Sequence, residues 1–121
     1  LEIPENVVVT GFLPAHKVNP MADISVIHGG QNTVMNACLS GTPIVGIGMH
    51  PEQQANIDAC VRKGFAKRLN KKRATASDVL ASIDELLQDE SAKAAVKIFQ
   101  GQLKEWNGPE NAALFLQETY G

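Results

Sequence analysis

Short runs rich in β-branched residues alternate with segments of helical periodicity, and this alternation constrains the fold more strongly than any other feature of the chain. The runs lie at positions 7–10, 24–27, 44–47 and 65–69. The intervening segments 33–39 and 52–63 place apolar residues on one helical face. Connections of this length suit right-handed crossover helices, which join parallel strands. The sequence therefore predicts an α/β fold, a Rossmann-like parallel sheet of about four strands with flanking helices.

The pattern after position 69 is purely helical. Thr75 and Asp78 have the spacing of a capping box and predict the start of one helix, and Ser91 is the predicted cap of a second. Pro109 suits the first turn of a last helix. Because no linker or internal repeat interrupts the 121 residues, we expect a single domain over 1–121, with βα units over about 7–69 and a helical tail over about 75–119.

The composition is that of a soluble globular domain. Hydrophobic residues make up 44% and charged residues 20% of the chain, which excludes a disordered tail and a disulfide scaffold. No apolar run reaches the length of a membrane span, and the first residues lack the pattern of a signal peptide. Cys38 and Cys60 are expected to be reduced, buried thiols, and the predicted location is cytoplasmic.

Most of the eleven basic residues lie between positions 62 and 73. The net charge of −2 gives no general attraction for nucleic acid, and the cluster lacks the interleaved aromatic residues of a single-strand binding surface. We expect a solvated helix end and loop and no nucleic-acid partner. Contact with anionic lipid stays open as an alternative, relevant if the acceptor is bound to a membrane.

The segment that carries chemistry follows the second predicted strand. It comprises His28, Gly29, Gly30, Gln31, Asn32 and Thr33. Ligands of open α/β sheets bind at the carboxyl ends of the strands, and a glycine turn that opens a helix favours an anion such as a diphosphate. The imidazole of His28 and the side chains of Asn32 and Thr33 would add hydrogen-bond donors. The alternative is a tight βα turn without a ligand.

Metal chemistry is not expected at this segment. No acidic cluster near it would hold Mg²⁺, and the spacings of His16, His28 and His50 match no metal-ligand pattern. Charge on a bound diphosphate would therefore be compensated by the helix start and the imidazole.

A longer stretch resembles the nucleotide-sugar donor motif of the UDP-glycosyltransferases, the inverting, metal-independent glycosyltransferases of the GT-B fold. The matching residues are Gly11-Phe12-Leu13-Pro14, Ala22 through Thr33, Gly41-Thr42-Pro43-Ile44-Val45, Glu52-Gln53 and Asn56. The resemblance implies that the chain is part of the C-terminal, donor-binding lobe of such an enzyme. The substrate would be a nucleotide sugar, a UDP- or TDP-hexose, with no cofactor.

The resemblance also implies roles for individual residues. His28 would contact the diphosphate, whereas Asn32 and Thr33 would bind the phosphate attached to the nucleoside. Glu52 and Gln53 match the acidic-Gln pair that binds hydroxyls of the transferred sugar.

The nucleoside end of the implied site departs from the family pattern. Phe12 stands where the family often has a Trp that stacks on uracil, and Leu13 would offer its backbone to the base. Ala15 replaces a Gln, and Asn36 replaces the Glu that holds the ribose hydroxyls. These changes leave the identity of the nucleotide open.

The catalytic base is expected outside this chain, in an N-terminal lobe that also binds the acceptor. The family's first two strands of the donor lobe also have no counterpart here, which predicts exposed strand edges and self-association. Three other functions remain as alternatives: a donor-binding subunit that works with a separate chain, a degenerate lobe kept for protein contacts, and a GT-B-fold sugar-nucleotide epimerase.

Overall fold

The computed structural model describes residues 5–7 and 15–105. Its sheet has the order β1-β2-β3, with all pairs parallel. The strands are β1 (Ser25–Ile27), β2 (Ile44–Gly46) and β3 (Ala66–Arg68). The predicted parallel α/β sheet is confirmed, but the described residues form three strands rather than about four. The first predicted strand, at 7–10, lies outside the described residues except for Val7.

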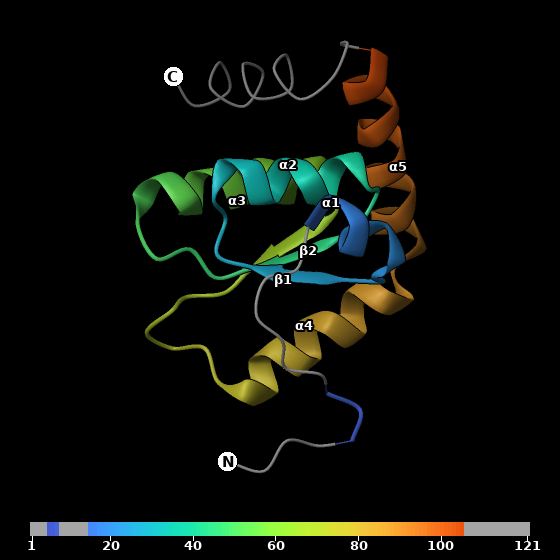
Figure 1. Cartoon of the computed structure of the whole chain (residues 1–121). Coiled ribbons are helices and arrows are strands. Elements are labelled where there is room, and N and C mark those ends of the chain that lie inside the picture. Colours follow the sequence, from blue (N-terminus) through green and yellow to red (C-terminus); the bar gives the residue numbers. More distant parts are fainter. Residues whose placement is uncertain (1–4, 8–14, 106–121) are drawn as a thin grey trace.

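Helices cover both faces of this sheet (Figure 1). One face carries α2 (Gln31–Leu39) and α3 (Pro51–Lys63), the two predicted crossover helices, and α4 (Ala76–Gln88) lies on the other. The short helices α1 (Ala15–Val18) and η1 (Asn19–Met21) precede β1. The last described helix, α5 (Glu90–Glu105), packs against α2 and α4.

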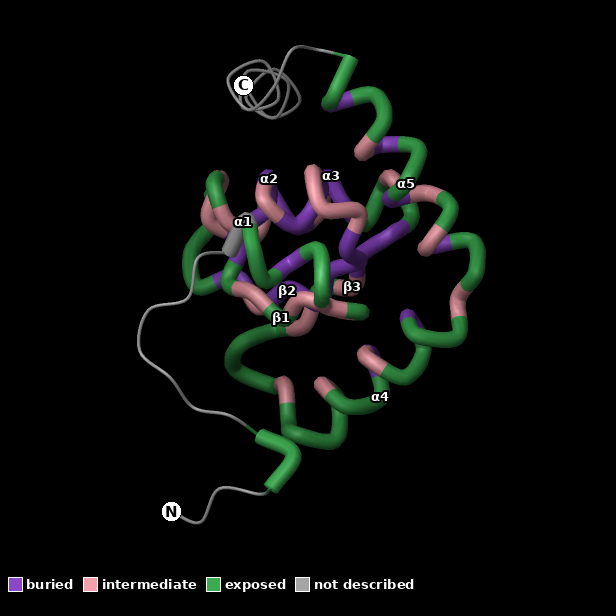
Figure 2. Tube along the Cα trace, turned by 45° about the vertical axis from the view of Figure 1, so that its right-hand side comes forward, coloured by how far each residue is buried: buried purple, intermediate pink, exposed green. Residues whose placement is uncertain are grey.

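The buried residues concentrate where α2 and α3 meet the strands, whereas most of α4 is exposed (Figure 2). Cys38 and Cys60, from these two helices, are buried as predicted and are free thiols. A hydrogen bond with Cys60 and burial hold the pKa of the Cys38 thiol well above its usual value, because both disfavour the thiolate. Both cysteines therefore serve as small core residues.

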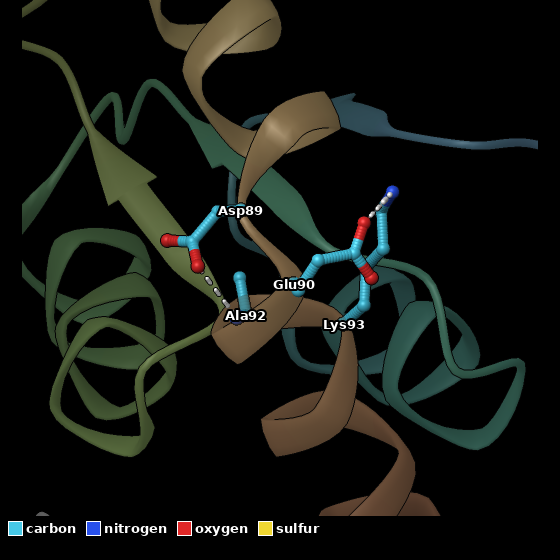
Figure 3. A network of polar contacts seen from close by, with 4 residues as sticks. All are labelled: Asp89, Glu90, Ala92 and Lys93. Atoms are coloured by element: carbon cyan, nitrogen blue, oxygen red, sulfur yellow. Dashed lines mark hydrogen bonds and ion pairs between the residues drawn. The ribbon is translucent and has the colours of Figure 1, made fainter.

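Two of the three helix starts predicted in the tail lie in the described residues and have different outcomes, whereas the start at Pro109 lies outside them. Thr75 and Asp78 form the expected capping box: Thr75 Oγ1 accepts from the Asp78 N–H, and Asp78 Oδ2 from the Thr75 N–H. The predicted Ser91 cap is wrong, since Ser91 lies inside α5. Asp89 Oδ1 accepts from the Ala92 N–H at 3.0 Å and caps the helix instead (Figure 3).

A glycine in β2 brings α3 close to the sheet. A Cβ added at Gly46 would lie 2.5 Å from Ile57 Cδ1, so only glycine leaves room for the Ile57 side chain there. This close packing sets the position of the first turns of α3 against the neighbouring strand end. Among residues 5–7 and 15–105, no helix has the length and apolarity that crossing a membrane requires.

Candidate functional site

The candidate site lies at the carboxyl edge of the sheet. Ile27 and Gly46 are paired in the register of β1 and β2, and the Ile47 N–H donates to the Ile27 carbonyl at 2.9 Å. The turn at 28–30, which leads into α2, therefore lies beside the loop at 47–50, which leads into α3. Parallel pairing thus brings together two segments that are about 20 residues apart in the sequence.

Gly29 places the backbone of the turn close to α3. Its φ is +96°, and an added Cβ would lie 2.6 Å from the Gln53 carbonyl oxygen, so conformation and space both require glycine. The carbonyl of Gly29 accepts a hydrogen bond of 2.9 Å from Asn56 Nδ2. Asn56 belongs to the motif found in the sequence, but only the structure shows that its buried side chain holds the turn.

The imidazole of His28 is exposed and does not pack into the core. Its Nδ1 lies 3.0 Å from the Gly30 nitrogen and 3.1 Å from Gln53 Nε2. Gly30 leaves space for the ring, because a Cβ at that position would lie 2.7 Å from His28 Cε1. The ring is thus held through one nitrogen at the open edge of the sheet.

The start of α2 follows directly, with Gly30 as its N-cap. The Val34 N–H donates to the Gly30 carbonyl at 2.9 Å, which closes the first helical turn. Asn32 is exposed and Thr33 half-buried within that turn. The N–H groups of a first helical turn have no acceptor within the helix, and the helix dipole adds positive potential there. This edge therefore suits an anion, and His28 lies beside it.

The first turn of α3 contains the predicted acidic-Gln pair. Glu52 is exposed, and Gln53 is half-buried beside the turn. Gln53 Oε1 accepts from the Met49 N–H at 2.9 Å, and the Met49 carbonyl accepts from Lys71 Nζ at 2.7 Å. The structure thus brings Gln53 to His28, a contact that sequence reasoning did not foresee. Met49 had no distinguishing sequence signal, and Lys71 stood out only as a member of the basic cluster.

The other predicted site residues have separate outcomes. Asn36 lies half-buried on α2, one helical turn after Asn32. Phe12 and Leu13 fall outside the described residues. Within the described part of the chain, no three His, Cys, Asp or Glu side chains converge in a group that could hold a metal ion.

Two members of the basic cluster at positions 62–73 form ion pairs with acidic side chains. Lys67 pairs with Glu85, and Arg68 pairs with Asp58 at 3.0 Å. Both pairs are substantially exposed, so each contributes little to stability. These contacts fit a solvated helix end and loop.

Fold and site together define a Rossmann-like α/β domain whose carboxyl strand edge suits an anion. The sequence profile of the family described as "UDP-glucoronosyl and UDP-glucosyl transferase" matches residues 3–102. The chain belongs to this family, which confirms the resemblance seen in the sequence.

Curated relatives agree with this assignment. The chain is 30% identical over 112 residues to the NDP-glycosyltransferase YjiC of Bacillus subtilis, covering 93% of this chain and 29% of the relative. It is 31% identical over 111 residues to demethyllactenocin mycarosyltransferase of Streptomyces fradiae, covering 92% of this chain and 24% of the relative. The chain thus spans less than a third of the length of these relatives.

Solved glycosyltransferases share the fold. The glycotransferase of kitacinnamycin superposes with a TM-score of 0.83 at 28% identity, covering 98% of this chain and 30% of that one. VinC, solved in complex with DTDP, has a TM-score of 0.83 at 22% identity, covering 98% of this chain and 30% of VinC. LpCGTa, solved in complex with UDP, has a TM-score of 0.73 at 18% identity, covering 95% of this chain and 30% of LpCGTa. These similarities confirm the α/β fold class.

Proposed function

We propose that this chain is the nucleotide-sugar donor-binding part of an inverting glycosyltransferase that transfers a hexose from a UDP- or TDP-sugar to an acceptor hydroxyl. The observation that carries the proposal is the exposed imidazole of His28, held by Nδ1 beside the start of α2 at the carboxyl edge of the sheet. Family membership supports the reaction class. VinC was solved in complex with DTDP and LpCGTa in complex with UDP, which supports the choice of nucleotide.

The proposed binding mode follows from the charges at the edge. The diphosphate would lie against the first turn of α2, where Asn32 and Thr33 meet the phosphate next to the nucleoside. His28 would meet the diphosphate through Nε2, because Nδ1 is already occupied by the Gly30 N–H. Glu52 and Gln53, at the adjacent start of α3, would bind hydroxyls of the sugar. Phe12, Leu13 and Asn36 would hold the base and ribose.

The proposed transfer uses this edge as an electrostatic support for the leaving group. The acceptor hydroxyl loses its proton to a base and attacks the anomeric carbon on the face opposite the diphosphate. The bond from that carbon to the diphosphate oxygen breaks, and the configuration inverts. The start of α2 and the imidazole of His28 stabilise the negative charge that develops on the departing nucleotide. No metal takes part in this scheme.

The base and the acceptor site are proposed to lie in a second lobe. Less than a third of each curated relative is matched by this chain, which leaves room for such a lobe. By itself the chain is expected to bind a nucleoside diphosphate weakly and to transfer nothing. The cytoplasmic location and self-association through strand edges remain predictions.

Calorimetric titration of the full chain with UDP, TDP and GDP tests the proposal. We expect heat with UDP or TDP, its loss in the His28→Ala variant, and little change in His50→Ala, which removes an exposed histidine from the next loop. Circular dichroism of both variants separates lost binding from lost folding. Absence of heat with all three nucleotides would instead favour a degenerate lobe kept for protein contacts.

A further inference from the structure

The hydrogen bonds around His28 determine which ring nitrogen carries the proton. The Gly30 backbone N–H lies 3.0 Å from Nδ1, and a backbone N–H acts only as a donor. Nδ1 must therefore present its lone pair. In the neutral ring the proton then resides on Nε2, the nitrogen that Gly30 does not occupy.

The orientation of the Gln53 amide is determined in the same way. The Met49 N–H donates to Gln53 Oε1 at 2.9 Å, so the oxygen end of the amide faces Met49. The amide nitrogen then faces His28 and donates to Nδ1 at 3.1 Å. Two backbone N–H groups, of Met49 and Gly30, thus impose consistent roles on both side chains.

The Met49 peptide is itself held from the opposite side. Its carbonyl accepts a hydrogen bond of 2.7 Å from Lys71 Nζ, which lies in the segment after β3. The donor to Gln53 is therefore part of a loop anchored at both its N–H and its C=O. This anchoring favours the amide orientation in which the nitrogen end of Gln53 faces His28.

We infer that Gln53 is a positioning residue that holds His28 as the neutral tautomer with Nε2–H directed to the bound diphosphate. This inference rests on the proposed function. A tautomer with Nδ1–H would place a lone pair, rather than a donor, toward the phosphate oxygens and would repel them. Gln53 uses one amide hydrogen and one oxygen lone pair in these contacts, so the remaining ones are left for a sugar hydroxyl.

Gln53→Glu is the sharpest test because it exchanges only the amide nitrogen for an oxygen. The new carboxylate still accepts from the Met49 N–H, and an acid suits the first turn of a helix, so folding is preserved. Toward Nδ1, however, the carboxylate only accepts. At about pH 8.5, well above the pKa of a free imidazole, the carboxylate opposes the Gly30 N–H donor at Nδ1, so the population of the Nδ1–H tautomer should rise in this variant.

The readout is the pair of ring ¹⁵N chemical shifts in the full chain labelled with ¹⁵N-histidine, without ligand, assigned by comparison with His28→Gln. We expect Nε2–H in the parent chain and in the matched control Gln54→Glu, and a clearly larger share of Nδ1–H in Gln53→Glu. Affinity for UDP, followed by NMR titration at the same pH, should fall about tenfold in Gln53→Glu, the size of one lost charge-assisted hydrogen bond. It should change by less than about twofold in Gln54→Glu, which adds the same charge one position later.

An Nδ1–H tautomer in the parent chain, or an unchanged tautomer in Gln53→Glu, would overturn the inference. So would equal losses of UDP affinity in the two variants, because charge alone would then explain them. The tautomer is measured without nucleotide, so this inference can fail independently of the proposed function. Failure of the proposed function would instead appear as absent UDP binding in a parent chain that has the expected tautomer.

Discussion

The side-chain amide of Asn56 donates a hydrogen bond of 2.9 Å to the backbone carbonyl of Gly29, which lies 27 positions earlier in the chain. Asn56 is buried, so this carbonyl has little access to water as a replacement partner. The bond joins the second turn of α3 to the turn that carries His28. It therefore couples the stability of the domain to the geometry of the candidate site.

Replacing Asn56 by Leu should destabilise the protein. The substitution leaves a buried carbonyl without its donor, which costs about 1–3 kcal/mol in the free energy of unfolding. Urea denaturation measures this loss. Asn70→Ala is the control: it removes an exposed hydrogen bond that Asn70 Oδ1 accepts from the Lys72 N–H, and it should change stability by about 0.5 kcal/mol or less. Equal losses of unfolding free energy in the two variants would contradict the larger contribution expected of the buried hydrogen bond.

Two glycine substitutions should change the stability of the protein in opposite directions. Gly29→Ala forces a side chain into a left-handed conformation and against the Gln53 carbonyl, so it should lose about 1–3 kcal/mol from the backbone conformation alone. Gly101 lies inside α5 with no atom within 4 Å of an added Cβ. Gly101→Ala should therefore gain about 0.5–1 kcal/mol through helix propensity. Thermal unfolding of both variants compares their stabilities with that of the parent chain. A Gly29→Ala variant as stable as the parent would contradict the close approach of Gly29 to the Gln53 carbonyl.

The capping box at the start of α4 gives a third prediction. Thr75→Ala removes the acceptor for the Asp78 N–H and should cost about 0.5–2 kcal/mol. Ser77→Ala, in the same exposed first turn, keeps the box and serves as the control. Urea denaturation that shows no difference between the two variants would mean that α4 does not depend on its cap.

The Cys38 thiol predicts a loss of stability at alkaline pH. Its pKa in the folded chain is raised, by the hydrogen bond with Cys60 and by burial, whereas an unfolded thiol titrates near about 8.5. Deprotonation therefore favours the unfolded state: the contribution is fully present below about pH 8.5 and is lost as pH rises toward the folded pKa.

Comparison with Cys38→Ala under reducing conditions isolates this effect. Between about pH 7.5 and 9.5 the parent chain should lose about 1 kcal/mol more than the variant in urea denaturation. In the folded chain, Cys38 should also resist alkylation at pH 8, because it is fully buried. Parallel pH curves for the two proteins would contradict the raised pKa.

Local sequence patterns predicted most of the elements because their causes are local. Alternating strand and helix periodicity located all three described strands and the two crossover helices. The capping box of Thr75 and Asp78 was also recognisable, since its donors and acceptors lie within one turn. The Ser91 cap was wrong because Asp89 and Ser91 are both good caps, and the backbone path into α5 decides between them.

Part of the site was predictable for a topological reason. A glycine turn after a strand of a parallel sheet must lie at the carboxyl edge, so the location of His28 follows from the sequence pattern. Its partnership with Gln53, 25 positions away, does not. That contact requires the pairing of Ile27 with Gly46 and the close approach of Ile57 to Gly46, which sets the start of α3 beside the turn.

The sequence by itself determined the α/β class, the family and the position of the candidate site at a strand end, because periodicity, turn residues and motif spacing are properties of the linear chain. Only the tertiary structure decided how the polar groups at the edge of the sheet are paired. The orientation of the His28 ring depends on the Gly30 and Met49 amides and on the Gln53 side chain, which come from segments that only strand register and helix packing bring together.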